Sequence, residues 1–423
     1  MTMNPKKPIP TIFAPTLEIS SLFILGIVLT LAGFGEARAD NSAELRLTNQ
    51  LEKSRASAPV SVSRDKLGFE EDGTKVQSLS IKEGNTTWNI PFQLDDTNQD
   101  GRWDELFFVV NIGPSESLSA KVTSGAETPD FGRQVKAFIK KGRVKNAVWE
   151  SELMGYRMYS FLHVDPLGKT VPRLTTKHFF GSNGHSHHNF TPGWGQDYLS
   201  IGNTMGVNSF FVQTSDGDIS RPWTSNSYHT ESGLPYDCQI EYKVIVDGPL
   251  RAVIEARING WEIGGESHEC RVRYTITAEQ RHTKVRISFN PHDNNADGVR
   301  LGTGFMQMYE DIYEQKTDSY MLAVARNTRE RGILHQWVGR AIVPFNQDGV
   351  EHLQMPDDPA KDFAPGNGPN AGLLFPPEQT TGEYAFVMAW EKDGGITSTE
   401  QWQNYVAELA ERVNHPVSVA VTR

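Results

Sequence analysis

The chain of 423 residues contains only two cysteines, Cys238 and Cys270. Two thiols are too few for a disulfide-rich scaffold or a four-cysteine zinc site, and the sequence leaves open whether they pair with each other. Basic residues are also scarce, since 41 Lys and Arg face 52 Asp and Glu and the formal net charge is −11. Nucleic acids are bound through concentrated positive charge, so this balance argues against a nucleic-acid partner.

Long apolar runs are missing after residue 39, where no stretch approaches the roughly 20 apolar residues that span a membrane. Residues 1–39 begin with Lys6 and Lys7, continue with an apolar run over 22–34, and end on the cleavage pattern Ala37-Arg38-Ala39. We therefore expect a signal peptide over 1–39 and a periplasmic or secreted protein without membrane contact after cleavage. A retained membrane anchor is the alternative.

Helical periodicity is scarce outside 398–413, whereas two-residue alternation of β-branched and aromatic residues recurs, as in 76–81 and 239–246. This pattern predicts an all-β fold, a large antiparallel β-sandwich with few helices. A jelly-roll pair and a propeller are alternatives, and the missing internal repeat counts against the propeller. The expected divisions are a lead-in over 40–59, a small N-terminal β module over 60–120, and a large sandwich domain carrying the catalytic site over 121–423.

The most specific local motif runs from Asp96 to Asp104. The oxygen-bearing side chains of Asp96, Asn98, Asp100 and Asp104 fall at positions 1, 3, 5 and 9 of a calcium-loop pattern, with Gly101 at position 6. The Glu expected at position 12 is absent. We expect a structural calcium ion and no organic cofactor; the alternative is a hairpin loop that binds no metal.

A second constellation covers residues 149–159. Treated as one extended segment, it places Trp149, Arg157 and Tyr159 on one face, and Glu150, Glu152, Tyr156 and Met158 on the other. Aromatic rings and planar polar groups suit sugars, so Trp149, Glu152 and Tyr159 are candidate substrate-binding residues. The alternative is an ordinary strand with a structural Arg–Glu ion pair.

A third constellation gathers His185, His187 and His188 in a loop rich in Gly and Asn, followed by Trp194 and Asp197. Histidine changes charge near neutral pH, so this cluster indicates acid–base catalysis or metal ligation. A zinc site built on His185 and His187 needs another ligand, for which Asp197 and His229 are candidates. The alternative is a solvated polar loop.

With these motifs identified, the chain resembles the bacterial domain of unknown function family 4861, whose members occur among exported polysaccharide-utilisation proteins. The resemblance rests on residues 90–96 with 104–106, 148–159, 188 with 195–202, and 247–253. It implies a supersandwich of the galactose-mutarotase-like kind and action on uronic-acid oligosaccharides, including water elimination from ulvan-type oligosaccharides. The crowded His185–His188 segment departs from the family pattern, in which one His is expected.

The resulting hypothesis is a carbon–oxygen lyase, a dehydratase or β-eliminating enzyme, with an oligosaccharide substrate. Arg157 would neutralise the uronate carboxylate, and His188 or His187 would take the C5 proton. Tyr156 or Tyr159 would protonate the leaving oxygen, Asp197 would orient the histidine, and Trp194 would contact the substrate. The alternatives are a non-catalytic carbohydrate-binding protein, or a glycoside hydrolase or epimerase with carboxylates from Glu150, Glu152 and Asp197.

Overall fold

A computed structural model gives the fold. It describes residues 42–422 except 70, 72, 142–145, 160–161, 180–190, 200, 202–203, 223–237, 292–297, 309–310, 327–335, 347, 356–366 and 378. The predicted signal peptide and the His185–His188 segment lie outside the described residues. In the described part of the chain, no helix is long and apolar enough to cross a membrane.

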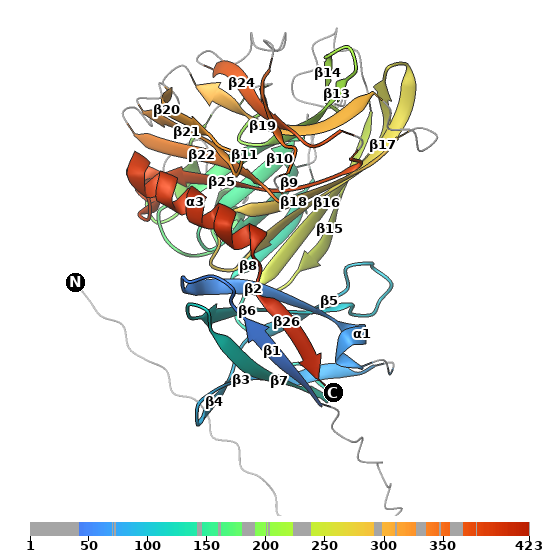
Figure 1. Ribbon diagram of the computed structural model, residues 1–423, viewed down its shortest axis with the longest axis vertical. Helices are drawn as coiled ribbons and strands as arrows, with labels where there is room; N and C mark the ends of the chain where they lie inside the picture. Colours follow the sequence, from blue (N-terminus) through green and yellow to red (C-terminus); the bar gives the residue numbers. More distant parts are fainter. Residues whose placement is uncertain are drawn as a thin grey trace, which may run out of the picture. The chain divides into compact units, whose positions relative to one another are not determined.

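A small β-sandwich is formed by the N-terminal part of the described chain together with its last strand (Figure 1). One sheet has the order β26 (Ser418–Thr422), β1 (Ser42–Thr48), β7 (Ser117–Gly125), β3 (Lys75–Glu83), β4 (Thr86–Asn89). The other has the order β2 (Arg55–Ser63), β6 (Glu105–Ile112), β5 (Phe92–Asp95), and the short helix α1 (Arg64–Leu67) follows β2. Alternating side chains such as Leu47, Leu79, Phe108 and Val122 fill the core between the two sheets.

The small sandwich differs from the expected division of the chain. The range 40–59, expected as a lead-in, contains β1 and the beginning of β2. Strand β7 runs across the predicted boundary at residue 120. In addition, β26 pairs antiparallel with β1, with Leu45 opposite Val421. Local sequence patterns do not report pairing between the two ends of a chain, so this closure was not predicted.

The rest of the described chain forms a larger all-β unit of three antiparallel sheets. The eight-stranded sheet has the order β15 (Gln239–Asp247), β16 (Arg251–Ile263), β17 (Glu266–Thr277), β18 (Thr283–Asn290), β25 (Thr381–Trp390), β22 (Trp337–Pro344), β21 (Met321–Arg326), β20 (Asp311–Lys316). The second sheet has the order β12 (Gly195–Asp197), β11 (His163–Lys169), β10 (Gly155–Tyr159), β9 (Asn146–Ser151), β8 (Val135–Lys140). The third has the order β14 (Ile219–Ser220), β13 (Ser209–Thr214), β19 (Val299–Met308), β24 (Asn367–Leu374), β23 (Glu351–Gln354).

One large apolar core joins these sheets. Trp149, Trp261 and Tyr274 are fully buried in it, and they come from strands of both the eight-stranded sheet and the β8–β12 sheet. The two-residue alternation that placed these residues on one face of their strands is the same pattern that predicted a large antiparallel sandwich. The predicted fold class is confirmed.

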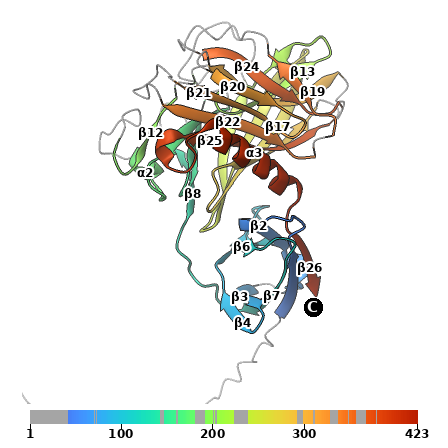
Figure 2. The ribbon, with the colours of Figure 1, turned by 60° about the vertical axis from the view of Figure 1, so that its left-hand side comes forward.

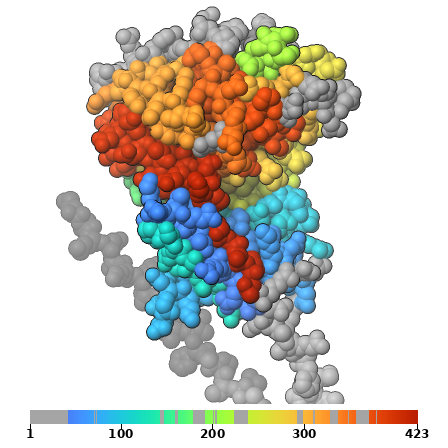
Figure 3. Space-filling view, in the orientation of Figure 1, coloured from blue at the N-terminus to red at the C-terminus, as the bar shows by residue number. Residues whose placement is uncertain are grey.

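Helix α3 (Thr399–Asn414) is the one long helix among the described residues, at the place predicted. Its first turn is capped by Ser398, whose side chain accepts a hydrogen bond from the Gln401 N–H. Trp402, Val406 and Leu409 are buried against the outer face of the eight-stranded sheet. Figures 2 and 3 show how the chain then continues from α3 into β26 of the small sandwich. The short 3-10 helix η3 (Glu391–Asp393) precedes α3.

A polar joint connects the small sandwich to the eight-stranded sheet. The Gln93 side chain lies against Gly248, where a Cβ would overlap the amide group. Gln93 Oε1 accepts hydrogen bonds from the backbone N–H groups of Leu250 at 2.8 Å and Arg251 at 2.9 Å. Arg251 pairs in turn with Asp95 and with Glu105. The residues that form these bonds lie in two of the sequence blocks that carry the family resemblance, 90–96 with 104–106 and 247–253.

Both cysteines are buried, Cys238 directly before β15 and Cys270 within β17. Cys270 lies on β17 opposite Ile258 of β16. Burial raises the pKa of the Cys270 thiol far above its ordinary value, which disfavours a reactive thiolate.

Candidate functional site

Residues 146–159 form a hairpin and not one extended segment. Strands β9 and β10 are joined by a tight turn in which Ser151 Oγ accepts a hydrogen bond from the Leu153 N–H at 3.1 Å. The register sets Trp149 opposite Tyr156 and Glu150 opposite Gly155. The predicted grouping of Trp149 with Arg157 is therefore wrong, because the turn reverses the chain between them.

The core face of this hairpin carries Trp149 and Tyr156, both fully buried. Trp149 Nε1 donates to Thr283 Oγ1 at 2.9 Å, and the Tyr156 hydroxyl donates to the Arg281 carbonyl at 2.6 Å. Burial raises the pKa of Tyr156 well above its usual value of 10. The structure does not bring Tyr156 together with Arg157: successive residues of a strand point to opposite faces, so the two cannot act on one substrate.

The opposite face of the β8–β12 sheet carries a charged layer that we call the charged face. It consists of Glu150, Arg157, His163, Asp165, Lys169 and Asp197, none of which is more than 8% exposed. Ionised side chains are rarely buried to this degree, because desolvation costs several kcal/mol per ion unless partners compensate. Such clusters are candidate functional sites.

Arg157 on β10 stands between two carboxylates. Its Nη2 contacts Asp165 of the adjacent β11 and lies 3.3 Å from Asp197 Oδ2 of β12. The Arg157 side chain is 9% exposed, and the carboxylates are 1% and 0% exposed. One guanidinium thus links three neighbouring strands. Its position is fixed by two charge-assisted hydrogen bonds.

Asp165 reaches this position because Arg157 and Asp165 are directly paired in the β10–β11 register. Asp197 reaches it through close contact of β12 with β11. Gly195, at the start of β12, has φ of 126°. A Cβ at this position would overlap the Gly168 carbonyl oxygen. Only glycine therefore fits, and Asp197 follows two residues later on the same side.

Glu150 and Lys169 form the second part of the charged face. Lys169 Nζ donates to the Glu150 carboxylate, to the Ser151 carbonyl and to the Arg173 carbonyl, the last at 3.0 Å. Burial lowers the pKa of Lys169, and the nearby Glu150 charge partly opposes this shift.

Glu150 also binds the start of helix α2 (Thr176–Phe179). Its carboxylate accepts hydrogen bonds from the backbone N–H groups of Thr175 at 2.8 Å and Thr176 at 3.1 Å, and from the Thr176 hydroxyl. The Glu150–Lys169 pair therefore holds the segment that leads into residue 180. These hydrogen bonds compensate for the desolvation of the two charges, and the pair acts as a structural anchor.

The remaining predicted residues are placed as follows. Trp194 is half-buried just before β12, and Tyr159 ends β10, with its side chain outside the described residues. Glu152 lies in the β9–β10 turn, where it accepts a hydrogen bond from the Glu279 N–H at 2.7 Å, and burial raises its pKa. His187 and His188, with the alternative zinc ligands His185 and His229, also lie outside the described residues. Of the predicted catalytic residues, the described structure brings together Arg157 and Asp197.

Three members of the charged face were missed from the sequence: His163, Asp165 and Lys169. The segment His163-Val164-Asp165-Pro166-Leu167-Gly168-Lys169 does carry the signal, because its polar residues alternate with period two. Alternation of this kind normally marks a solvent-facing side. Only the three-dimensional fold shows that this side is buried.

The Asp96–Asp104 loop joins β5 to β6, and Gly101 has φ of 92° at its turn. Asp104 Oδ2 accepts hydrogen bonds from the N–H groups of Thr97 at 2.6 Å and Asn98 at 3.0 Å. Asp96 accepts from those of Asp100 at 3.1 Å and Gly101 at 2.8 Å. Within the described ranges, no three His, Cys, Asp or Glu side chains are grouped as metal ligands. Calcium binding stays a prediction.

The fold and the charged face define an all-β sandwich protein with a buried ionic site. The chain belongs to the family described as a domain of unknown function, DUF4861, whose model matches residues 47–419. It is 21% identical over 411 residues to uncharacterized protein P7 of Formosa agariphila, covering 91% of this chain and 95% of that protein.

Among solved structures, a glycosyl hydrolase family 38 protein from Enterococcus faecalis superposes with a TM-score of 0.51 at 11% identity, covering 90% of this chain and 48% of that one. An alpha-mannosidase from E. faecalis V583 has a TM-score of 0.48 at 10% identity, covering 90% and 46%. The chain thus spans about half the length of these solved structures. The first likeness establishes a shared β-sandwich fold.

Proposed function

We propose that this protein is a carbon–oxygen lyase that eliminates water or a sugar from uronate-containing oligosaccharides, such as ulvan oligomers, in the periplasm or outside the cell. The observation that carries the proposal is Arg157, a buried guanidinium fixed by Asp165 and Asp197 on the charged face. The family resemblance to polysaccharide-utilisation proteins supports a carbohydrate substrate, and so does the sandwich fold shared with a glycosyl hydrolase family 38 protein.

The elimination chemistry needs a group like Arg157. The C5 proton of a uronate becomes acidic only when the neighbouring carboxylate is neutralised by a cation or by dense hydrogen bonding. Arginine suits this task because its planar guanidinium binds a carboxylate through two parallel hydrogen bonds. Asp165 and Asp197 hold the guanidinium in one orientation. Little conformational entropy of this side chain is therefore lost when the substrate reacts.

The base in this proposal is His188 or His187. The segment containing them joins α2 to β12, and both elements contact the charged face, through Glu150 and Arg157 respectively. Asp197 takes a different part from the one expected, because its contact with Arg157 makes it a positioning residue for the guanidinium. Since Tyr156 is turned into the core, Tyr159 remains as the candidate acid.

A glycoside hydrolase is the second candidate, and a specific feature favours it. Asp165 and Asp197 supply two neighbouring carboxylates to the charged face, and glycoside hydrolysis needs a pair of carboxylates that flank the scissile bond. Because both hold Arg157 Nη2, this reaction requires the guanidinium to move out from between them. The two reactions differ in their products. Elimination creates an unsaturated uronate that absorbs ultraviolet light, whereas hydrolysis creates a reducing end without this absorbance.

The experiment incubates the protein with uronate oligosaccharides and follows both signals for wild type, Arg157→Lys and Arg281→Lys. The Arg281–Asp393 pair is a matched control, because its side chains are 9% and 1% exposed, as in the Arg157–Asp165 pair. We expect new absorbance with wild type, about 10²-fold or greater loss of kcat with Arg157→Lys, and a change below about 3-fold with Arg281→Lys.

Equal losses in the two variants, with equal loss of thermal stability, would show that Arg157 is only a structural residue. Reducing sugar without absorbance would replace the lyase with the hydrolase. Neither product, together with measurable binding of the oligosaccharide, would leave a carbohydrate-binding protein.

A further inference from the structure

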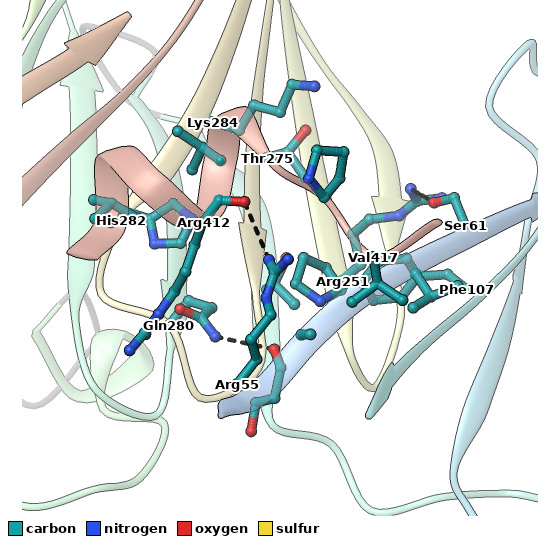
Figure 4. A pocket seen from close by; sticks show the side chains of 18 of the residues that line it. Arg55, Ser61, Phe107, Arg251, Thr275, Gln280, His282, Lys284, Arg412 and Val417 are labelled. Atoms are coloured by element: carbon teal, nitrogen blue, oxygen red, sulfur yellow. Dashed lines mark hydrogen bonds between the residues drawn. The ribbon is translucent and has the colours of Figure 1, made fainter. Parts of the chain in front are cut away.

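A separate cavity of about 440 Å³ lies on the outer face of the eight-stranded sheet, away from the charged face. It is lined by β2 of the small sandwich, by β16–β18 of the large sheet, and by the end of α3 with the residues that follow it (Figure 4). Its volume falls within the range of small-molecule sites, about 300–1,000 Å³.

The lining of this cavity is strongly basic, although the whole chain has a formal charge of −11. Its ionisable side chains, His282 aside, are Glu383 and six cations: Arg55, Arg251, Arg273, Lys284, Arg286 and Arg412. Acids outside the lining pair with three of these cations: Arg251 with Asp95 and Glu105, Arg273 with Glu255, and Arg412 with Glu408. Counting the described residues alone, three cations therefore remain for one lining carboxylate.

Two of these three lie side by side on β18. Lys284 and Arg286 share Glu383, at 2.9 Å and 3.4 Å. Arg286 is also directly opposite Arg273 in the β17–β18 register. Like charges in directly opposed positions destabilise a sheet, so an anion placed above them would be bound favourably.

Arg55 is the third cation, and it is 5% exposed. Its Nη1 and Nη2 donate to the carbonyls of His415 and Arg412 at the end of α3, the latter at 3.1 Å. Among the described residues, no carboxylate pairs with it, and its buried Nε has no acceptor. Burial and the neighbouring Arg412 charge lower its pKa. The two carbonyls thus accept some of the hydrogen bonds that the guanidinium can donate, but they do not neutralise its positive charge.

The rest of the lining offers polar groups and one partly exposed ring. Thr275, Thr277 and Gln280 present hydroxyl and amide groups, and Phe345 presents a ring that has Lys284 Nζ 5.0 Å from its centroid. The Phe107 ring is 2% exposed and packs under Arg251. His282 Nδ1 is buried without a partner in the described part of the chain. Burial lowers the pKa of His282 to about 4, so its ring is neutral at pH 7 and offers one donor and one acceptor. Sugars combine hydroxyls with apolar C–H faces, which such a lining matches.

We propose that this cavity binds one anionic sugar unit, with its carboxylate or sulfate between Arg55, Lys284 and Arg286 and its ring against the threonines and Phe345. The site is separate from the charged face, because the two lie on different sheets with the core between them. Binding in this cavity does not require catalysis, so the binding proposal can be tested independently of the proposed lyase activity.

The test measures binding to the full chain by calorimetry, with glucuronate, a monosulfated glucose and neutral glucose as probes. We expect binding of one or both anionic sugars and none of glucose, with affinity falling as salt is raised. Lys284→Ala and Arg286→Ala should each weaken binding about 10-fold or more. Arg271→Ala is the matched control, since Arg271 lies on the same sheet face as Arg273 but outside the cavity.

Arg157→Lys distinguishes the two sites, and it should leave this binding unchanged. Loss of binding in Arg157→Lys with full binding in Arg286→Ala would assign the anion to the charged face and overturn the proposal. Equal weakening by Arg271→Ala and Arg286→Ala would show diffuse surface attraction only, and no binding of either anionic sugar would also overturn it. Arg55 is not used as a variant, because it holds the end of α3.

Discussion

Replacing Glu150 by Gln provides a sharp test of how the charged face is held together. The substitution keeps the size of the side chain and one acceptor oxygen, but it removes the charge that faces Lys169. The ammonium of Lys169 is 1% exposed, and it would then be left with two neutral carbonyl partners. The result is an uncompensated buried charge.

The expected cost follows from that burial. Removing one partner of a buried ion pair costs about 3–5 kcal/mol. The neutral amide oxygen in the Glu150→Gln variant would also form weaker hydrogen bonds than the carboxylate with the backbone N–H groups of Thr175 and Thr176. With a urea m-value of roughly 3–4 kcal/mol/M for a protein of this size, the midpoint of unfolding should fall by about 1 M. The double variant Glu150→Gln with Lys169→Met removes both charges and should recover most of this loss.

The pH dependence has a defined sign. Burial already lowers the pKa of Lys169 in the folded protein, and loss of Glu150 lowers it further. Between the folded and the unfolded pKa, the unfolded chain binds more protons, so stability rises with pH. The deficit of Glu150→Gln relative to wild type should therefore shrink from the folded Lys169 pKa of the variant up to that of wild type, which lies below the ordinary lysine value of about 10.

Urea unfolding followed by tryptophan fluorescence at several pH values measures both effects. The reasoning fails if Glu150→Gln costs less than about 1 kcal/mol, or if the double variant is as unstable as the single one. It also fails if the deficit is the same at every pH. In each case the buried ammonium would not be the source of the cost.

Three further predictions concern the Asp96–Asp104 loop, the His185–His188 segment and the N-terminus. If the Asp96–Asp104 loop binds calcium, a chelator should lower the melting temperature of wild type and not that of Asp96→Asn with Asp100→Asn; an unchanged wild-type melting curve would favour a metal-free turn. His188→Ala should lower kcat about 10²–10⁴-fold with little change in stability, and a larger loss in His187→Ala would exchange their roles. Mass spectrometry of protein from the native host should find an N-terminus at or near Asp40; the intact chain in membranes would mean a retained anchor.

The fold class could be predicted from the sequence because alternation is a local signal. Helix α3 was equally visible, since Ser398 caps it and Trp402, Val406 and Leu409 repeat with helical spacing. The closure of the small sandwich by β26 was not visible, because it depends on a partner more than 360 residues away. The local sequence of a strand does not indicate which distant strand it pairs with.

The charged face shows a different limit. Arg157 and Asp197 could be proposed from residue chemistry alone, but their partner Asp165 could not, because its segment has the pattern of a solvent-facing strand. The error at Trp149 and Tyr156 came from one turn. Glu152, Leu153 and Met154 contain no Gly, Pro or Asn to announce a hairpin, and Ser151 makes the turn with its own hydroxyl.

The sequence blocks that carry the family resemblance divide between two structural tasks. Gln93, Asp95 and Arg251 hold the small sandwich to the large sheet, so that block pair explains assembly and not chemistry. Arg157 and Asp197 lie on the charged face, where they are too deeply buried for solvent to stabilise their charges. A substitution in the first pair should therefore act mainly through stability. If substitutions of the second pair also lowered stability and activity in parallel, the charged face would be a structural element, and the basic cavity would be the candidate site of the reacting groups.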